Sequence, residues 1–232
     1  MEININEESF VVNDTAIIPK VESFWELVNA GKWEPQTFNI LDKFLDEDHT
    51  YIDIGTWIGP TILYGSRKSK FCYALEPDHI AYAEAIANIR LNDIRNINLY
   101  HKGLYDIESR MEMKNRKRCG DGMAKVITDG SKGWLANFTT FDKFVESNNI
   151  QDCSLIKMDI EGAEEVVLPT MADYIQKTQV PLFVSIHYHL VKDPSKLKQI
   201  IKDIAKLYIK PTTVDEISEY RSEILFGGDE SA

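Results

Sequence analysis

The sequence has few cysteines, and their spacing excludes several classes of protein. The three residues, Cys72, Cys119 and Cys153, are widely separated and form no C-x-x-C pair. An odd number at this spacing does not suggest a disulfide framework, and it does not suggest a zinc cluster. Isolated thiols are typical of a reducing compartment, so we expect a cytoplasmic protein.

Long apolar runs and an excess of positive charge are also missing. The longest apolar stretch, residues 180–190, is too short to span a bilayer, and the first eight residues do not resemble a signal peptide. Lys and Arg number 26 against 37 Asp and Glu, which gives a net charge of −11. Because nucleic-acid binding depends on Lys and Arg, this balance argues against a nucleic acid as the main partner.

From residue 51 onward, short apolar runs alternate with helix-like segments. Strands are expected at 51–55, 71–76, 96–101, 153–158 and 181–187, with a last β element near 223–226, and helices at 60–68, 79–91, 162–176 and 194–208. This alternation predicts an α/β fold with a doubly wound, parallel sheet. Residues 51–232 would form the main domain of a single compact chain.

Residues 1–50 are expected to form an N-terminal extension or cap of this domain. A strand is expected at 9–12, and helices at 21–30 and 39–45. The aromatic-rich turn between these helices contains Trp33, Glu34 and Thr37. These three side chains could close a site from the N-terminal side, although aromatic residues at such positions are more often part of a core.

The alternation stops at residues 107–131, which are polar, basic and contain glycine. We interpret this stretch as an inserted hairpin or loop with a strand at 123–128, followed by a helix that Thr140 caps. The insertion contains a basic cluster of five residues: Arg110, Lys114, Arg116, Lys117 and Arg118. Such a cluster is typical of a solvated loop, and it could instead attract an anionic substrate.

A glycine motif follows the first strand of the alternating region. Asp53, Gly55 and Gly59 stand in a D-x-G-x-x-x-G pattern, with Thr56 after the first glycine. A dinucleotide-binding loop would read G-x-G-x-x-G, because its backbone must approach a pyrophosphate. A wider loop with an acidic residue suits a positively charged cofactor without phosphates, such as S-adenosylmethionine.

Glu76 ends the next expected strand and provides a second cofactor signal. It lies at about the 20-residue offset from the glycine loop at which a carboxylate reaches the hydroxyl groups of a ribose. A carboxylate can accept hydrogen bonds from both hydroxyls of a diol, and such charge-assisted bonds are strong. Glu76 is therefore expected to bind the ribose of the cofactor.

The two later parallel strands end in groups suited to proton transfer. Asp159 and Glu161 follow one strand, and His187 and His189 end the other. Neighbouring parallel strands would bring these groups to the sheet edge that carries the glycine motif. A histidine there could act as a general base, the four residues could bind Mn, Fe or Zn, or the acids could only favour a helix N-terminus.

Taken in order, these blocks resemble the FkbM-type S-adenosylmethionine-dependent methyltransferases. The resemblance extends from about residue 31 to 227 and rests on DIGTWIGPT at 53–61, ALEPD at 74–78, NIRLN at 88–92, TFD at 140–142 and IKMDIEGAE at 156–164. The last block is the most specific to the family. Members often carry Glu shortly before the histidine that ends the following strand, whereas here Ser185 precedes Ile186 and His187.

The resemblance implies a class I methyltransferase fold, which is Rossmann-like, with a mostly parallel seven-stranded sheet. It also implies transfer of a methyl group from S-adenosylmethionine to a hydroxyl of a sugar, glycan or other small molecule, with S-adenosylhomocysteine as the product. A metal ion is not predicted. The alternatives are an RNA methyltransferase and a non-catalytic binding module that retains the fold. Neither the identity of the methyl acceptor nor the oligomeric state follows from the sequence.

The resemblance also implies the roles of individual residues. The expected cofactor-binding residues are Asp53, Gly55, Thr56, Gly59, Glu76, Pro77, Gly103 and Asp159. The glycine motif would line the methionine part, Glu76 the ribose, and residues 103–106 the adenine. His187, Asp159 and Glu161 are the expected catalytic residues, with His187 as the base.

Overall fold

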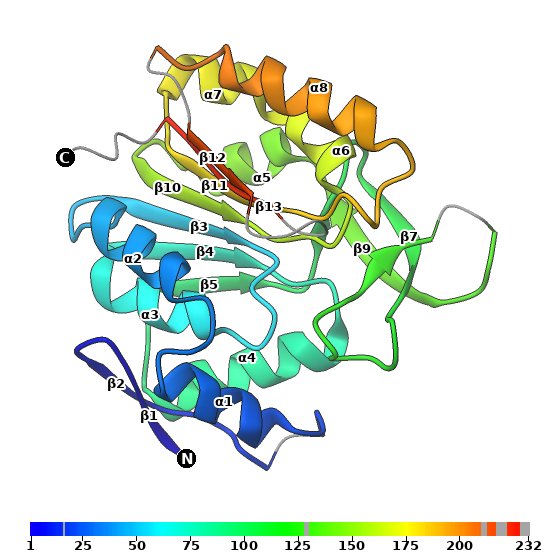
Figure 1. The fold of residues 1–232 in the computed structure, drawn as a ribbon. Coiled ribbons are helices and arrows are strands. Elements are labelled where there is room, and N and C mark those ends of the chain that lie inside the picture. Colours follow the sequence, from blue (N-terminus) through cyan, green and yellow to red (C-terminus); the bar gives the residue numbers. More distant parts are fainter. Residues whose placement is uncertain (16, 128–129, 210–212, 217–221, 228–232) are drawn as a thin grey trace.

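The structure, a computed structural model, describes residues 1–15, 17–127, 130–209, 213–216 and 222–227. Its centre is a mixed sheet in the order β12-β13-β11-β10-β3-β4-β5 (Figure 1). The strands are β3 (Thr50–Ile54), β4 (Phe71–Leu75), β5 (Ile97–Tyr100), β10 (Cys153–Met158), β11 (Leu182–Ile186), β12 (Thr213–Glu216) and β13 (Ser222–Phe226). β3, β4, β5, β10 and β11 are parallel, and β13 is antiparallel to both of its neighbours. The α/β architecture predicted from the sequence is therefore confirmed, with a mixed sheet.

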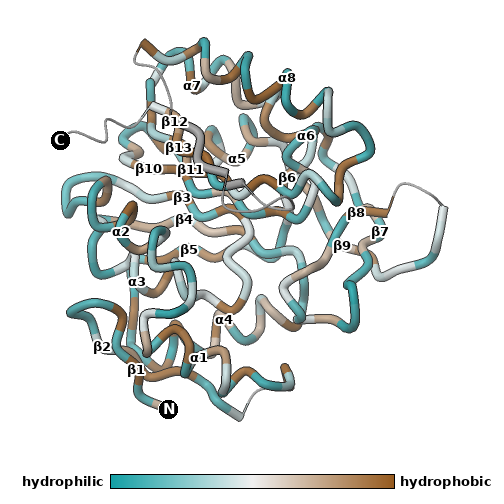
Figure 2. Tube along the Cα trace, viewed as in Figure 1, coloured by the Kyte–Doolittle hydropathy of each residue, from teal (hydrophilic) through white to brown (hydrophobic). Residues whose placement is uncertain are grey.

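Helices cover both faces of this sheet (Figure 1). They are α3 (Pro60–Lys68), α4 (His79–Leu91), α5 (Phe141–Ser147), α6 (Glu164–Val167), a 3₁₀ helix (Leu168–Met171), α7 (Ala172–Thr178) and α8 (Pro194–Ala205). Successive strand residues face opposite cores, so that Ile52 packs with α5 to α8 while Tyr51 packs with α3. Figure 2 shows α8 alternating between hydrophobic and hydrophilic residues, as expected of a helix with one face on the sheet.

The prediction of a single helix over 162–176 is wrong, because the chain forms three short helices there instead. Pro169 lies at the start of the 3₁₀ helix and has no N–H to continue an α-helical ladder. The interruption leaves α6 only four residues long, directly after β10. This short helix carries Glu164, a residue that matters for the site.

The N-terminal extension is not only helical. β1 (Glu2–Ile5) and β2 (Glu8–Val11) form a separate antiparallel sheet, followed by α1 (Val21–Asn29) and α2 (Pro35–Phe44). β1 was not expected, although its residues alternate between exposed and buried. Trp25 of α1 is fully buried in the hydrophobic cluster that also contains residues of α3 and β3.

The insertion contains an antiparallel hairpin of β7 and β8, as expected, and this hairpin is part of a second sheet. β6 (Gly103–Leu104), β7 (Ser109–Lys114), β8 (Lys125–Val126) and β9 (Trp134–Thr139) pair in the order β6-β9-β7-β8. The strand expected at 123–128 is limited to two residues, and Thr128 lies outside the described residues. In Figure 1, β7 and β9 stand beyond the carboxyl ends of β3, β4 and β5. The second sheet is thus positioned to cover that edge.

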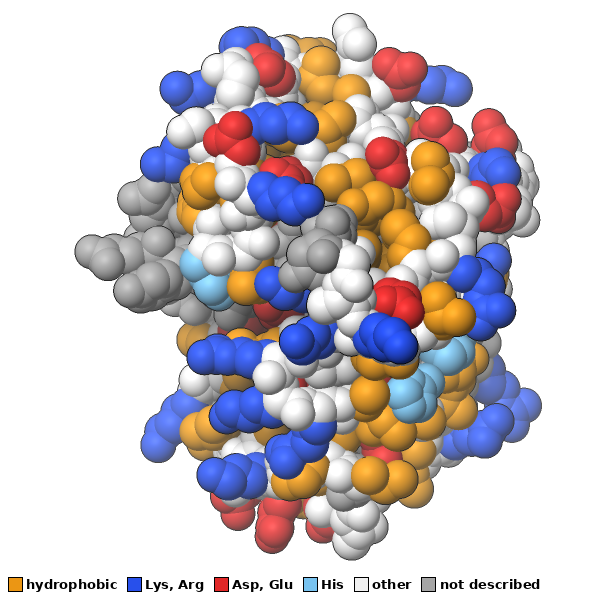
Figure 3. All heavy atoms as spheres, turned by 90° about the vertical axis from the view of Figure 1, so that its right-hand side faces the viewer, with side chains coloured by type: hydrophobic (Ala, Val, Ile, Leu, Met, Phe, Trp, Pro, Cys, Tyr) orange, Lys and Arg blue, Asp and Glu red, His pale blue; other side chains and the backbone are white. Residues whose placement is uncertain are grey.

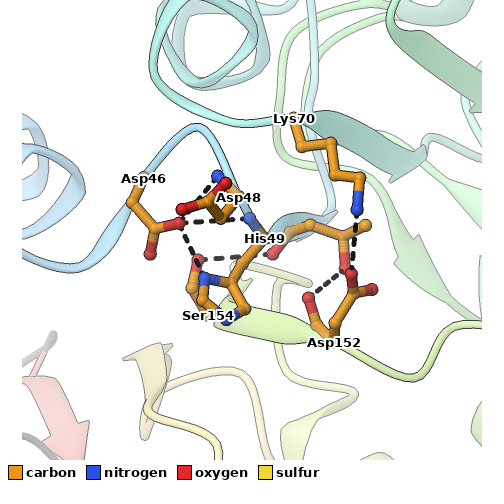
Figure 4. A network of polar contacts seen from close by, with 7 residues as sticks. Asp46, Asp48, His49, Lys70, Asp152 and Ser154 are labelled. Atoms are coloured by element: carbon orange, nitrogen blue, oxygen red, sulfur yellow. Dashed lines mark hydrogen bonds and ion pairs between the residues drawn. The ribbon is translucent and has the colours of Figure 1, made fainter.

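A polar network lies at the surface where β3, β4 and β10 begin, at the ends of these strands away from the second sheet (Figure 4). His49 Nδ1 lies 2.6 Å from Asp46, and Lys70 Nζ lies 3.4 Å from Asp152. The hydrogen bond and charge of Asp46 raise the pKa of His49. Exposed pairs of this kind contribute little to stability. Within the described residues, no helix has the length and apolar composition needed to cross a membrane.

Candidate active site

A cavity of about 360 Å³ opens at the carboxyl ends of the parallel strands. Its volume lies within the range of about 300–1,000 Å³ that is usual for small-molecule sites. The expected site residues that line it are Gly55, Thr56, Glu76, Pro77, Gly103, Asp159, Glu161 and His187. Trp33 and Glu34 of the N-terminal segment and His189 also line it. Asp53 and Gly59 are not among the lining residues.

The glycine loop approaches the neighbouring strand so closely that Gly55 cannot carry a side chain. Gly55 has a φ of +82°, and a Cβ built on it would lie 1.9 Å from the carbonyl oxygen of Asp159. The contact arises because β3 and β10 are adjacent, with Ile54 opposite Met158. The loop therefore presents bare backbone to the cavity, next to Asp159.

Asp53 stabilises this loop from within the core. Its carboxylate is fully buried and accepts hydrogen bonds from the hydroxyls of Thr56 (3.0 Å) and Thr61 (2.6 Å). Lys157 Nζ lies 3.4 Å away and completes the group. Burial acts to lower the pKa of Lys157, but the charges of Asp53 and Asp159 outweigh it and raise that pKa. Lys157 therefore remains charged inside the protein.

Glu76 is held rigidly at the base of the cavity. Its two carboxylate oxygens accept hydrogen bonds from the backbone N–H groups of Trp57 (2.9 Å) and Asp78 (2.8 Å). Only 7% of the residue is exposed, and this burial raises the pKa of Glu76 to about 8. Each oxygen has a second lone pair, so the carboxylate can still accept hydrogen bonds from a ligand.

Three carboxylates surround His187 at the end of β11. Nδ1 lies 3.0 Å from Glu164 and donates to it, while Nε2 lies 3.5 Å from Asp159 and 3.6 Å from Glu161. Burial acts to lower the pKa of His187, but the hydrogen bond to Glu164 and the surrounding negative charges raise it to about 9. The bond to the fully buried Glu164 fixes the ring, so that Nε2 is left for a ligand.

Asp159, Glu161 and His187 also have the composition of a metal site. One ligand atom of each lies within 4.8 Å of the others. Glu161 has a φ of +52° and Gly162 a φ of +97°, so the chain turns sharply between β10 and α6. Left-handed backbone in a residue other than glycine is uncommon and often occurs at functional sites. The trio could thus hold a divalent cation or transfer a proton.

Two residues, Asp78 and Trp57, hold the insertion over the cavity. Neither was predicted to have this role. Asp78 caps α4 and also accepts hydrogen bonds from Asn115 (2.7 Å) and the backbone of Gly120 (2.6 Å). Trp57 Nε1 donates to the Gly120 carbonyl at 2.9 Å. The helix-capping position of Asp78 was visible in the sequence, but its partners more than 35 residues away were not.

Residues 53–215 match the methyltransferase FkbM domain family. A hexuronic acid methyltransferase of Haloferax volcanii, AglP, is 24% identical over 203 residues, which cover 88% of this chain and 81% of that protein.

Two solved structures resemble the fold. An FkbM methyltransferase from Methylobacillus flagellatus has a TM-score of 0.53 and 18% identity, over 77% of this chain and 43% of the other. A Streptococcus mutans protein in complex with SAH has a TM-score of 0.52 and 11% identity, over 82% and 94% of the two chains. This chain thus spans less than half of the Methylobacillus protein. Because the matched family pattern covers well over half of the sequence, the chain belongs to the FkbM methyltransferase family.

Proposed function

We propose that this methyltransferase transfers a methyl group to a hydroxyl of a sugar, glycan or other small molecule. S-adenosylmethionine is its cofactor and supplies a methyl group that is already activated as a sulfonium. The observation that carries the proposal is the single cavity lined by the glycine loop, Glu76 and the group around His187. The Haloferax relative, which is named a hexuronic acid methyltransferase, supports a carbohydrate acceptor. A cytoplasmic location stays a prediction.

The residues of the cavity fit this cofactor part by part. We assign the methionine part to the bare backbone of Gly55 and Thr56 and to Asp159, the ribose to Glu76 beside Pro77, and the adenine to the region of Gly103. The absence of a Cβ at Gly55 lets the loop lie against the Asp159 carbonyl, so that Gly55 and Asp159 reach the cofactor together. Asp53 and Gly59 would act from beneath the loop, Asp53 through the threonine hydroxyls.

An acceptor hydroxyl must lose its proton, which it holds about as tightly as water does, with a pKa of about 15.7. We assign the base to Nε2 of His187, which Glu164 orients through Nδ1. Asp159 and Glu161 flank this nitrogen and would position the hydroxyl in line with the transferred methyl group. The ring is protonated at neutral pH in the free protein. It must therefore lose this proton before it can accept the proton of the hydroxyl.

Calorimetry with S-adenosylhomocysteine tests the cofactor site. We expect it to bind, and we expect Glu76→Gln to weaken binding about 10- to 100-fold, since the amide nitrogen that replaces one oxygen cannot accept a hydrogen bond from the ribose or from the backbone. Glu84→Gln is the matched control, because Glu84 is also buried but bonds Asn13 and does not line the cavity. Absence of binding to the unaltered protein would contradict the proposal. Binding without methylation of any hydroxyl would favour a binding module.

A second variant tests the close approach of the loop. Gly55→Ala is expected to abolish binding of S-adenosylhomocysteine, because the added methyl group would collide with the Asp159 carbonyl and displace both sides of the cavity. Gly31→Ala is the control: Gly31 also has a positive φ (+62°), but nothing lies within 4 Å of its Cβ position. It carries only the conformational cost, about 1–2 kcal/mol. Equal affinities of the two variants would refute the assigned contact.

A further inference from the structure

A second cleft, of about 490 Å³, adjoins the active-site cavity. The two share Met123 and Val126 of the insertion and Glu161 and His189 at the ends of the central strands. A molecule in the second cleft therefore lies against the same Glu161 that stands 3.6 Å from His187. The position is that of an acceptor rather than a cofactor, because Gly55 and Glu76 line only the first cavity.

Three cationic side chains line this cleft: Lys114, Arg116 and Lys125. All three are exposed. Within the described residues they form no ion pair, and the one polar contact of the Arg116 side chain is with the sulfur of Met123 at 4.0 Å. The chain as a whole has 37 acidic residues against 26 Lys and Arg. A cleft lined by three cations, with Glu161 as the acidic residue among its described lining, is therefore unusual for this protein. Figure 3 shows Lys and Arg side chains gathered on this side of the molecule.

The register of the insertion places two of these charges directly opposite each other. Lys114 of β7 pairs with Lys125 of β8 in the antiparallel ladder. Directly opposite residues of such a pair lie on the same face with their Cβ atoms about 4.5–5.5 Å apart, and like charges there destabilise the sheet. Both side chains line the same cleft, so an anion between them would relieve this repulsion and bind both.

We propose that this cleft binds an anionic group of the methyl acceptor, and that the substrate is therefore an acidic saccharide carrying a carboxylate or a phosphate. The proposal rests on the proposed methyl transfer to a hydroxyl. Lys114 and Lys125 hold the anion, Arg116 adds a planar group suited to either oxyanion, and Glu161 marks the border where the acceptor enters the cavity. The pair of lysines selects the acceptor by charge, while the group around His187 acts on its hydroxyl.

The test uses three ligands that differ only at C6 of the sugar. They are p-nitrophenyl glucoside, its 6-phosphate and p-nitrophenyl glucuronide, each titrated into protein saturated with S-adenosylhomocysteine. We expect at least one charged ligand to bind about tenfold or more tightly than the neutral one, and its identity distinguishes carboxylate from phosphate. In Lys114→Gln/Lys125→Gln this preference is expected to disappear, with affinity for the neutral glucoside unchanged.

Arg110→Gln/Lys117→Gln is the matched control, because both residues are exposed cations of the insertion that do not line the cleft. It removes the same net charge and should keep the preference. Thermal unfolding gives a second measurement: without ligand, Lys114→Gln/Lys125→Gln should be at least as stable as the unaltered protein, because a like-charge pair is removed.

Three results would overturn the assignment. They are charged ligands that bind no better than the neutral one or not at all, a preference that survives in Lys114→Gln/Lys125→Gln, and an RNA oligonucleotide that binds in preference to all three. The S-adenosylhomocysteine titration identifies a failure of the cofactor site separately.

Discussion

Replacement of His187 by glutamine is expected to lower kcat by about 100- to 10,000-fold, the usual contribution of a positioned general base. Glutamine is of similar size and its amide can still donate to Glu164, but it cannot take a proton from the acceptor. Affinity for S-adenosylhomocysteine should be retained, which separates this variant from one that disrupts the cavity. The measurement is the release of S-adenosylhomocysteine at saturating acceptor, with calorimetry on the same preparations.

The same residue predicts the pH dependence of the reaction. The pKa of His187 is about 9 in the free protein, so the neutral form that can accept a proton increases as pH rises from 7 to 9. We therefore expect kcat/KM to rise over this interval and then level off. Glu164→Gln removes a carboxylate at 3.0 Å and should move the rise to lower pH, whereas Glu165→Gln should not. A flat profile between pH 7 and 9 would exclude His187 as the base.

Protonation of His187 also links stability to pH. The folded-state pKa of about 9 lies above the ordinary histidine value of 6.5, so the folded form binds this proton more tightly than the unfolded chain does. The resulting stabilisation is fully present below about pH 6.5 and is lost as pH rises through about 9. His187→Gln should abolish this part of the pH dependence. Urea unfolding at about pH 6 and about pH 9.5, on either side of this window, measures it without any substrate.

Chelation distinguishes proton transfer by His187 from binding of a metal ion by the same trio. If the histidine acts as a base, EDTA leaves the activity unchanged although His187→Gln removes it. If the trio holds a cation, EDTA abolishes the activity and an added divalent metal restores it. The loss caused by His187→Gln is common to both cases, so the chelation result decides between them.

The parts of the site that the sequence predicted share one physical cause. Residues that follow parallel strands meet at one edge of the sheet, so the positions after β3, β4, β10 and β11 converge whatever the intervening loops do. Gly55, Glu76, Asp159 and His187 line one cavity for this reason. Their local patterns, an apolar run followed by glycine or acid, are short and readable from the sequence.

The parts that the sequence did not predict depend on contacts between distant residues. β6 pairs in parallel with β9, so that Gly103 lies opposite Phe138, and no local pattern specifies such a pairing. The bond of Glu164 to His187 spans 23 residues and joins the first residue of α6 to the residue after β11. Asp53 was expected to contact the cofactor; its carboxylate is fully buried and lies 3.4 Å from Lys157, which stands opposite it on the neighbouring strand.

The pair formed by Asp53 and Lys157 gives the largest expected effect on stability. Lys157→Met is expected to lower the free energy of unfolding by about 3–5 kcal/mol, because it leaves the Asp53 carboxylate charged and buried without its cation. Methionine has a similar length and fills the space of the lysine stem, so the loss reports the charge and not a cavity. Urea unfolding at neutral pH measures it.

The double variant Asp53→Asn/Lys157→Met separates the charge from the packing. It contains no buried charge at this position, and replacing a whole buried pair is often neutral. We therefore expect it to recover most of the stability that Lys157→Met loses, while the amide oxygen introduced at position 53 can still accept hydrogen bonds from Thr56 and Thr61. A double variant no more stable than Lys157→Met would show that the pair acts through packing. If instead stability returns without binding of S-adenosylhomocysteine, the pair of Asp53 and Lys157 contributes to the cofactor site that Lys157 lines.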